Sequence, residues 1–150
     1  MNHTGQLPLR VATLGAILTL LTASAVKAEP RCSQATVSGT YVTVGSGTLG
    51  ANTTGAAAYA AMGKVTYDGR GNGEAIFTQS VAGTVSSKLR ATGTYTVNSD
   101  CTGSKNFGGP SGTNYDFVVT ADGREIVWIV TNAGAVLSGR AIRLDDSRTP

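Results

Sequence analysis

Apolar and polar residues alternate with a period of two along most of the chain after residue 35. This spacing is typical of β-strands, in which successive side chains point to opposite faces. In the clearest case, residues 85–97, an apolar set alternates with a polar one: Leu89, Ala91, Gly93, Tyr95 and Val97 against Lys88, Arg90, Thr92, Thr94 and Thr96. We expect the apolar set to face the interior and the polar set to face water.

The same pattern predicts further strands along the chain. Their expected ranges are 35–44, 62–67, 74–81, 85–97, 102–107, 115–120, 124–131 and 135–144. Residues 46–55 are expected to form a loop, and the alanine-rich segment 56–61 fits either a helical turn or a strand. The Asp-Gly and Asn-Gly pairs within 68–73 favour a hairpin turn over a phosphate-binding loop or a calcium site.

Seven or eight strands joined by short turns favour antiparallel neighbours. Such strands bury one face by closing into a barrel or by stacking two sheets. Glycines inside strands, at Gly39, Gly63, Gly93 and Gly139, suit the sharp bends of a small barrel. We therefore predict an all-β, seven- to eight-stranded antiparallel up-and-down barrel over residues 29–150, with a two-sheet sandwich as the alternative.

Residues 1–28 have the features of a signal peptide. Arg10 precedes an apolar run at 11–21, and small residues at Ala25 and Ala28 indicate cleavage before Glu29. The apolar run is short for a retained membrane anchor, which is the weaker alternative. We expect a secreted or periplasmic protein without a membrane span after signal removal.

Removal of this segment changes the charge balance. Arg10 and Lys27 leave with it, so ten of the twelve basic residues remain against nine acidic ones, a net charge of +1. This balance favours neither nucleic acid nor an anionic membrane as a partner. The oligomeric state is not determined by these patterns.

Cys32 and Cys101 are the two cysteines of the chain. In an oxidising compartment two such thiols usually pair, and a closure of this length is worth roughly 4 kcal/mol. A metal site would need imidazole or further thiol ligands, but the single histidine, His3, leaves with the signal peptide. We predict a Cys32–Cys101 disulfide, no metal and no cofactor.

The residues available limit the possible chemistry. Without histidine or a free thiol, Ser-His-Asp and Cys-His nucleophilic catalysis are excluded. Glu74, Asp116 and Glu125 are the carboxylates outside the expected turns, and we expect them on the surface rather than as a catalytic pair. No residue is predicted to be catalytic.

Three side chains are candidates for binding a ligand inside the barrel. Tyr95 and Trp128 could stack on it, although large aromatic residues in a small barrel usually fill the core. Arg140 could bind a carboxylate if Val136, Ser138 and Ile142 share its inward face. It is a solvated charge if Leu137, Gly139 and Ala141 face inward instead.

The strand of Trp128, residues 124–131, is apolar on both faces. Ile126 and Val130 share the face of Trp128, whereas Val127 and Ile129 lie on the other. We therefore expect the barrel interior to cover one face and a packed partner surface to cover the other.

Several motifs resemble a known group of proteins. They are Cys32, Gly39-Thr40-Tyr41, the segments 65–73 and 92–103, Gly123-Arg124-Glu125-Ile126, and Ser138-Gly139-Arg140-Ala141. The pattern resembles small secreted bacterial proteins of unassigned function that are similar to the allene oxide cyclase and dirigent barrels, a calycin-like fold. The resemblance implies an apolar cavity, and for the cyclases one that folds a hydrophobic substrate. We carry over no catalytic residue of that family to a position of this sequence.

Together these observations predict a secreted β-barrel that binds a small apolar ligand or acts as an envelope or extracellular interaction module. The alternative is a cofactor-independent cyclase or isomerase that acts through the shape of its cavity on a hydrophobic substrate.

Overall fold

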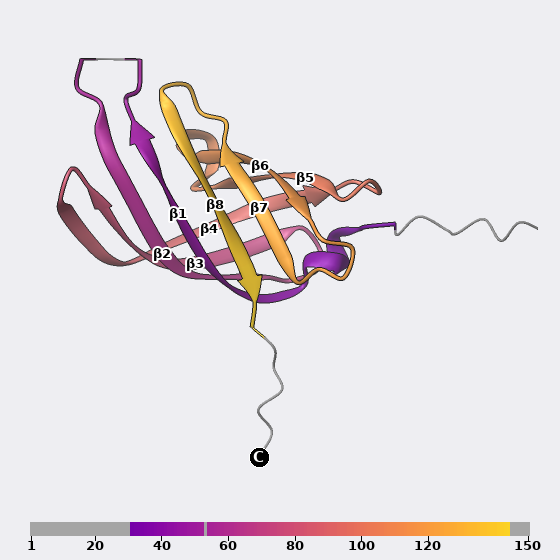
Figure 1. Cartoon of the computed structure of the whole chain (residues 1–150). Coiled ribbons are helices and arrows are strands. Elements are labelled where there is room, and N and C mark those ends of the chain that lie inside the picture. Colours follow the sequence, from indigo (N-terminus) through magenta and orange to yellow (C-terminus); the bar gives the residue numbers. More distant parts are fainter. Residues whose placement is uncertain (1–30, 53, 145–150) are drawn as a thin grey trace, which may run out of the picture.

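The computed structural model describes residues 31–52 and 54–144, which form a closed antiparallel barrel with strands in sequence order (Figure 1). The strands are β1 (Gly39–Leu49), β2 (Ala57–Tyr67), β3 (Asn72–Val81), β4 (Thr84–Val97), β5 (Thr102–Phe107), β6 (Thr113–Val119), β7 (Glu125–Val130) and β8 (Ala135–Arg143). Two short 3₁₀ helices, η1 (Gln34–Val37) and η2 (Gly109–Ser111), complete the described elements. The pairing of β1 with β8 closes the barrel, so the predicted barrel is confirmed over the sandwich.

The predicted signal peptide, 1–28, lies outside the described residues. Within residues 31–52 and 54–144, no helix has the length and apolar character to cross a membrane.

The first two strands differ from their predicted bounds. Residues 34–37 form η1, and β1 continues to Leu49 through part of the expected loop. The alanine-rich segment becomes the start of β2, where Ala57 pairs with Leu49 and Ala58 with Thr48. Alanine prefers helices, but a single helical turn is marginal in water, whereas pairing with β1 satisfies the backbone of the whole segment.

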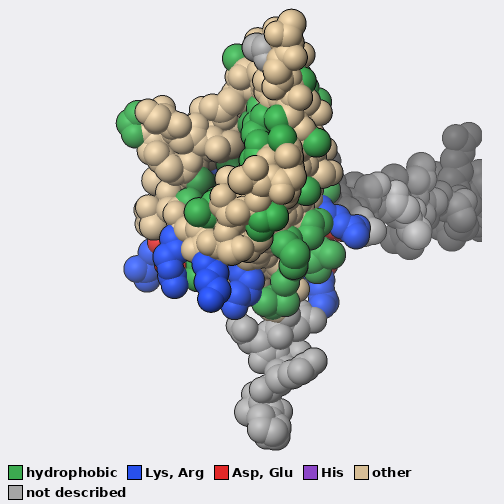
Figure 2. All heavy atoms as spheres, turned by 90° about the vertical axis from the view of Figure 1, so that its left-hand side faces the viewer, with side chains coloured by type: hydrophobic (Ala, Val, Ile, Leu, Met, Phe, Trp, Pro, Cys, Tyr) green, Lys and Arg blue, Asp and Glu red, His purple; other side chains and the backbone are tan. Residues whose placement is uncertain are grey.

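The long hairpins β1–β2 and β3–β4 extend beyond the shorter strands at one end of the barrel (Figure 1). On its other side, β4 pairs with β5 only from Gly93 to Val97, so the first part of β4 has no neighbour there. We call this end the mouth. Figure 2 shows a face from this side, with Lys and Arg side chains gathered in its lower half and hydrophobic side chains above them.

The facing predicted for β4 is confirmed. Tyr95 is buried and Leu89 is half-buried, whereas Arg90 and Thr94 are exposed, and Val97 and Lys88 follow the same division. The alternation is regular from Leu89 onward. Before it, the pairing with β3 shifts between Phe77 and Gln79, and Lys88 has a positive φ of 55°. This irregularity is a β-bulge, which interrupts the alternation nearer the mouth.

The opposite end of the barrel is closed by η1. The disulfide between Cys32 and Cys101, with a Cα–Cα distance of 4.9 Å, joins the segment before η1 to the turn after β4, as predicted. A backbone hydrogen bond from Cys32 N to Ser99 O, 3.2 Å long, supports the same junction. The chain before the first strand is therefore held across the barrel end.

Beneath η1 lies a compact set of side chains that we call the closed-end core: Val37, Tyr41, Tyr67, Tyr95, Val119, Ile126 and Ala141. The Tyr41 hydroxyl donates to Gly123 O at 2.6 Å, and Arg143 Nη2 donates to the Tyr41 hydroxyl at 2.7 Å and to Thr36 O. Tyr67 packs edge-to-face against Tyr41 and Tyr95, with ring centroids 5.7 and 4.9 Å away. This end of the barrel is filled by side chains.

The outer surface keeps several large apolar side chains in water. Val118 and Val127, which are partners across β6 and β7, are each 55 % exposed, and Ile129 is 52 % exposed. The sequence predicted that both faces of β7 are covered. The inward face is covered, because Ile126, Trp128 and Val130 are buried. The partner surface remains a prediction.

Candidate functional site

A cavity of about 240 Å³ lies inside the barrel, between the closed-end core and the mouth. Three alanines line one side, from strands β2, β3 and β4: Ala61, Ala75 and Ala91, with the larger Tyr59 and Phe77 beside them. Large aromatic side chains form the facing wall, from strands β5, β6 and β7: Phe107, Tyr115 and Trp128. The three alanines therefore leave space opposite the aromatic wall.

Two glycines determine where Trp128 can lie. Gly45 on β1 and Gly139 on β8 are partners in the sheet. A Cβ atom added to Gly45 would lie 2.2 Å from Cη2 of Trp128, and one added to Gly139 would lie 2.4 Å from Cζ2. Such distances are impossible, so only glycine leaves room for the indole against this wall. Trp128 Nε1 donates to Thr43 Oγ1 at 3.3 Å, which orients the ring.

Lys105 on β5 lies in the interior, with only 8 % of its surface exposed. Its strand partners are Tyr95 on β4 and Tyr115 on β6. Among the described residues it is the single charged side chain in the buried class, and it lines the cavity. Its Nζ donates a hydrogen bond to the hydroxyl of Tyr67 at 3.2 Å.

Four aromatic rings surround the Lys105 amine, and we call this arrangement the aromatic box. The distances from Nζ to the ring centroids are 4.7 Å for Tyr115, 5.5 Å for Trp128, and 5.9 Å for both Tyr67 and Phe107. Ring faces attract a cation, with each good contact worth about 0.5–2 kcal/mol. Tyr115 and Trp128 also pack edge-to-face at 5.4 Å, which holds two of the four walls together.

Burial changes the charge state of this amine. It lowers the pKa of Lys105 from 10.5 to about 7, and desolvation is the only cause of the shift. Burial also raises the pKa of Tyr67, so its phenol stays neutral at neutral pH and supplies no negative charge. Within the described structure no carboxylate pairs with Lys105, so its positive charge is balanced only by the hydroxyl and the ring faces.

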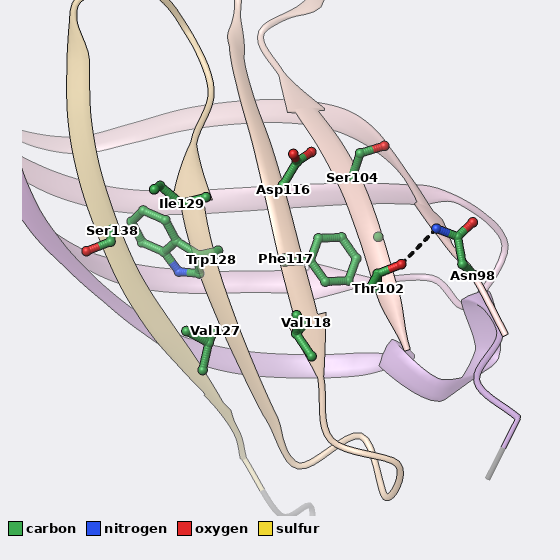
Figure 3. A pocket seen from close by; sticks show the side chains of 11 residues that line it. Asn98, Thr102, Ser104, Asp116, Phe117, Val118, Val127, Trp128, Ile129 and Ser138 are labelled. Carbon is green, nitrogen blue, oxygen red and sulfur yellow. Dashed lines mark hydrogen bonds between the residues drawn. The ribbon is translucent and has the colours of Figure 1, made fainter. Parts of the chain in front are cut away.

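A second concave region lies on the outer surface over β5, β6, β7 and β8 (Figure 3). It is larger, about 600 Å³, but it is a broad depression open to solvent. Its polar side chains, such as Asp116 and Ser104, are exposed, and Asn98 Nδ2 bonds to Thr102 Oγ1 at 2.9 Å (Figure 3). Because a ligand there would stay largely hydrated, the interior cavity, which opens at the mouth but holds the buried amine, is the better candidate site.

The three predicted ligand residues lie in different places. Trp128 lines the cavity. Tyr95 is buried but belongs to the closed-end core, where its hydroxyl donates to Gln34 O at 3.1 Å. Arg140 is exposed on the outer surface between Val44 and Val127, whereas Leu137, Gly139 and Ala141 face inward. Arg140 is therefore not the anchor of an interior ligand, since its strand turns the apolar set inward.

Lys105 was not among the predicted site residues. A signal for it exists, because it lies two positions before Phe107 and therefore on the same face of β5. A lysine in a short strand is ordinarily exposed, and that expectation outweighs the spacing.

The composition of the site also bears on metals. Within the ranges that the structure describes, no group of three or more His, Cys, Asp or Glu residues is placed to hold a metal ion.

The chain was compared with models of protein families, with curated proteins and with solved structures, and none of these comparisons gives a match.

Proposed function

We propose that this protein is a secreted or periplasmic barrel that binds a small, mainly apolar molecule carrying one acidic oxygen group, with Lys105 as the anchor. The observation that carries the proposal is a buried amine, without a carboxylate partner in the described structure, on the wall of an aromatic cavity. The disulfide supports an oxidising compartment for this role.

The volume of the cavity limits the size of the ligand. An engineered apolar cavity of about 150 Å³ in another protein holds benzene. By proportion, the 240 Å³ cavity fits a molecule of about ten non-hydrogen atoms. Its aromatic walls favour a flat, unsaturated or aromatic body, because ring faces pack well against such surfaces.

The charge of the cavity determines the preferred polar group. A carboxylate placed at Lys105 would pair with the ammonium where water is largely excluded. A hydrogen bond to a charged group contributes about 1.5–3 kcal/mol. It would also compensate a charge that the described chain leaves without a carboxylate.

The proposal can be tested by titration calorimetry at pH 6.5 with two matched probes, trans-cinnamate and cinnamyl alcohol. We expect the acid to bind about 10- to 100-fold more tightly than the alcohol, the ratio that corresponds to one charged hydrogen bond. Lys105→Met should abolish this preference while retaining binding of the alcohol. Arg140→Ala, which removes an exposed positive charge, is the matched control and should leave the preference unchanged.

Absence of binding for both probes, and for other flat molecules of similar size, would contradict the proposal. An unchanged preference for the acid in Lys105→Met would contradict the anchoring role of the amine.

The same geometry supports a second candidate, a cofactor-independent cyclase or isomerase, because Lys105 and Tyr67 form a hydrogen-bonded pair beside the cavity. An amine with a pKa of about 7 can give and accept protons at neutral pH. Turnover of a hydrophobic substrate that is lost in both Lys105→Met and Tyr67→Phe would favour this candidate over simple binding.

The remaining alternative is an envelope or extracellular interaction module, which would use the outer surface. Some apolar side chains there are direct neighbours, such as Val118 and Val127, but polar ones interrupt the surface: in the sheet Arg140 lies between Val127 and Val44, and Ser138 lies beside Ile129. The interior therefore carries the stronger argument.

A further inference from the structure

We propose that Lys105 forms a reversible imine with small apolar aldehydes that enter the barrel, so that the cavity is a covalent aldehyde-binding site. The inference rests on the proposed function, because the aldehyde must first occupy the same cavity as the acidic ligand.

The position of the amine suits this reaction. Nζ lies at the cavity wall, and its one hydrogen bond to a side chain of the described protein, to Tyr67, leaves it without a salt bridge that would keep it protonated. Burial lowers the pKa of Lys105 to about 7, so neutral and charged amine coexist at neutral pH. An ordinary exposed lysine is almost fully protonated at this pH and is a poor nucleophile.

The reaction needs no oxidant, reductant or cofactor. The neutral amine attacks the aldehyde carbon and a C–N bond forms. The carbonyl π bond breaks, its electron pair moves to the oxygen, and a proton passes from nitrogen to that oxygen, which gives a carbinolamine. Loss of one water molecule then produces the C=N bond. The Tyr67 hydroxyl, 3.2 Å from Nζ, is placed to transfer protons in these steps because its raised pKa keeps it in the neutral, proton-bearing form.

The aromatic box favours the product. A protonated imine carries its positive charge at the same nitrogen, which lies 4.7 Å from the Tyr115 centroid and 5.5 Å from that of Trp128. These ring faces attract that charge. The burial that lowers the pKa of Lys105 also favours the neutral imine, which removes the charge from the cavity. A conjugated aldehyde spreads the charge along its chain and fits the flat aromatic walls, so we assign unsaturated or aromatic aldehydes of about ten non-hydrogen atoms as the ligand class.

The wild-type protein contains its own comparison residues. Lys64 and Lys88 are exposed, whereas Lys105 is buried. The disulfide-intact protein is incubated at pH 7 with trans-cinnamaldehyde and a mild borohydride reductant, digested, and mapped by mass spectrometry. We expect the reduced adduct at Lys105 to form at least about tenfold faster than at Lys64 or Lys88, since the neutral fraction of the amine sets the rate.

Two further measurements test whether the preferential labelling of Lys105 depends on the folded cavity. In urea-unfolded protein, Lys105 should lose its advantage over Lys64 and Lys88. Without reductant, the native protein should change the absorbance of cinnamaldehyde, because a conjugated imine replaces its carbonyl group, and Lys105→Arg should show no such change.

The outcomes distinguish the inference from the proposed function. If cinnamate and cinnamyl alcohol bind but Lys105 acquires no adduct, the imine is refuted and the binding function stands. If none of the three probes binds, both are refuted. Equal labelling of Lys64, Lys88 and Lys105 in the native protein also refutes the imine site, because it would show only the general reactivity of lysine.

Discussion

The two ends of the barrel use aromatic residues in opposite ways. In the closed-end core, the Tyr41 hydroxyl donates to Gly123 O and accepts from Arg143, and its ring packs against Tyr67. Around the cavity, a second set of rings, which shares Tyr67 with the closed-end core, surrounds an amine and leaves about 240 Å³ unfilled. The closed end is organised for stability, whereas the cavity end retains a buried charge and empty space that both lower stability.

This difference follows from the size of the side chains that face one another. At the closed end, inward positions on β1 and β7 carry bulky residues such as Tyr41 and Ile126, and η1 covers them. Nearer the mouth, β2, β3 and β4 place Ala61, Ala75 and Ala91 inward. A region that leaves stabilising contacts unmade in this way is a common property of binding sites.

The largest expected effect comes from comparing two tyrosines, one from each end. Tyr41 is fully buried and hydrogen-bonded, whereas Tyr59 at the mouth is half-buried, with a 3.4 Å contact to Gln79. Tyr41→Ala should lower the free energy of unfolding by about 3–5 kcal/mol. Tyr59→Ala should lower it by only about 1 kcal/mol. Urea denaturation measures both, and equal losses would show that the two ends do not differ in this way.

Replacing the buried amine should change stability in the opposite direction. Lys105→Met removes a desolvated charge and keeps a side chain of similar length, so we expect the free energy of unfolding at pH 7 to rise by about 1–4 kcal/mol. Lys64→Met at an exposed position is the control and should change it by less than about 0.5 kcal/mol. A loss of stability in Lys105→Met would mean that the contacts with the aromatic box outweigh the free-energy cost of burying the charge.

The pH dependence of stability should report the same amine. Below pH 7, Lys105 is protonated in both the folded and the unfolded states, so its burial penalty is complete there. Between pH 7 and 10.5 the unfolded state binds more protons, so the free energy of unfolding should rise with pH, at most by about 1.4 kcal/mol per pH unit.

The tyrosines near Lys105 limit the pH range over which the free energy of unfolding rises. Burial raises the pKa values of Tyr67, Tyr95 and Tyr115, so ionisation of the unfolded chain should reverse the trend above pH 10. Denaturation at pH 7, 8 and 9 should show the rise in wild type and a flatter profile in Lys105→Met. The same profile in both proteins would assign the effect to another group.

The smallest effect is expected for the outer surface. Arg140→Ala should leave the affinity for trans-cinnamate unchanged within about twofold, because an exposed charge outside the barrel wall is screened from the cavity. Calorimetry beside wild type tests this. A larger loss of affinity would indicate that the anion binds on the outer surface near Val44 and Val127.

Much of the fold could be predicted from local patterns. The alternation along β4 predicted which side chains face inward, and the Asp68 turn follows from its local hydrogen bonds, in which Asp68 Oδ1 accepts from the backbone N–H groups of Arg70 and Asn72 at 2.7 and 2.9 Å. The extension of β1 and the conversion of the alanine segment to strand could not be predicted in this way. Both depend on pairing with residues distant in sequence, which local propensity does not include.

The sequence by itself predicted antiparallel strands, the disulfide and the alternating faces of strands such as β4, because these follow from short turns, a pair of cysteines and a period of two. Closure of the barrel rather than a two-sheet sandwich came from the pairing of β1 with β8. Only the tertiary structure decided which of those faces would hold the site. Arg140 lies in a strand of apolar and small residues and Lys105 in a mainly polar one, yet the structure places Arg140 outward and Lys105 inward. The low pKa of Lys105 results from rings brought by β2, β6 and β7, and the desolvation that they impose exists only once those strands surround the amine.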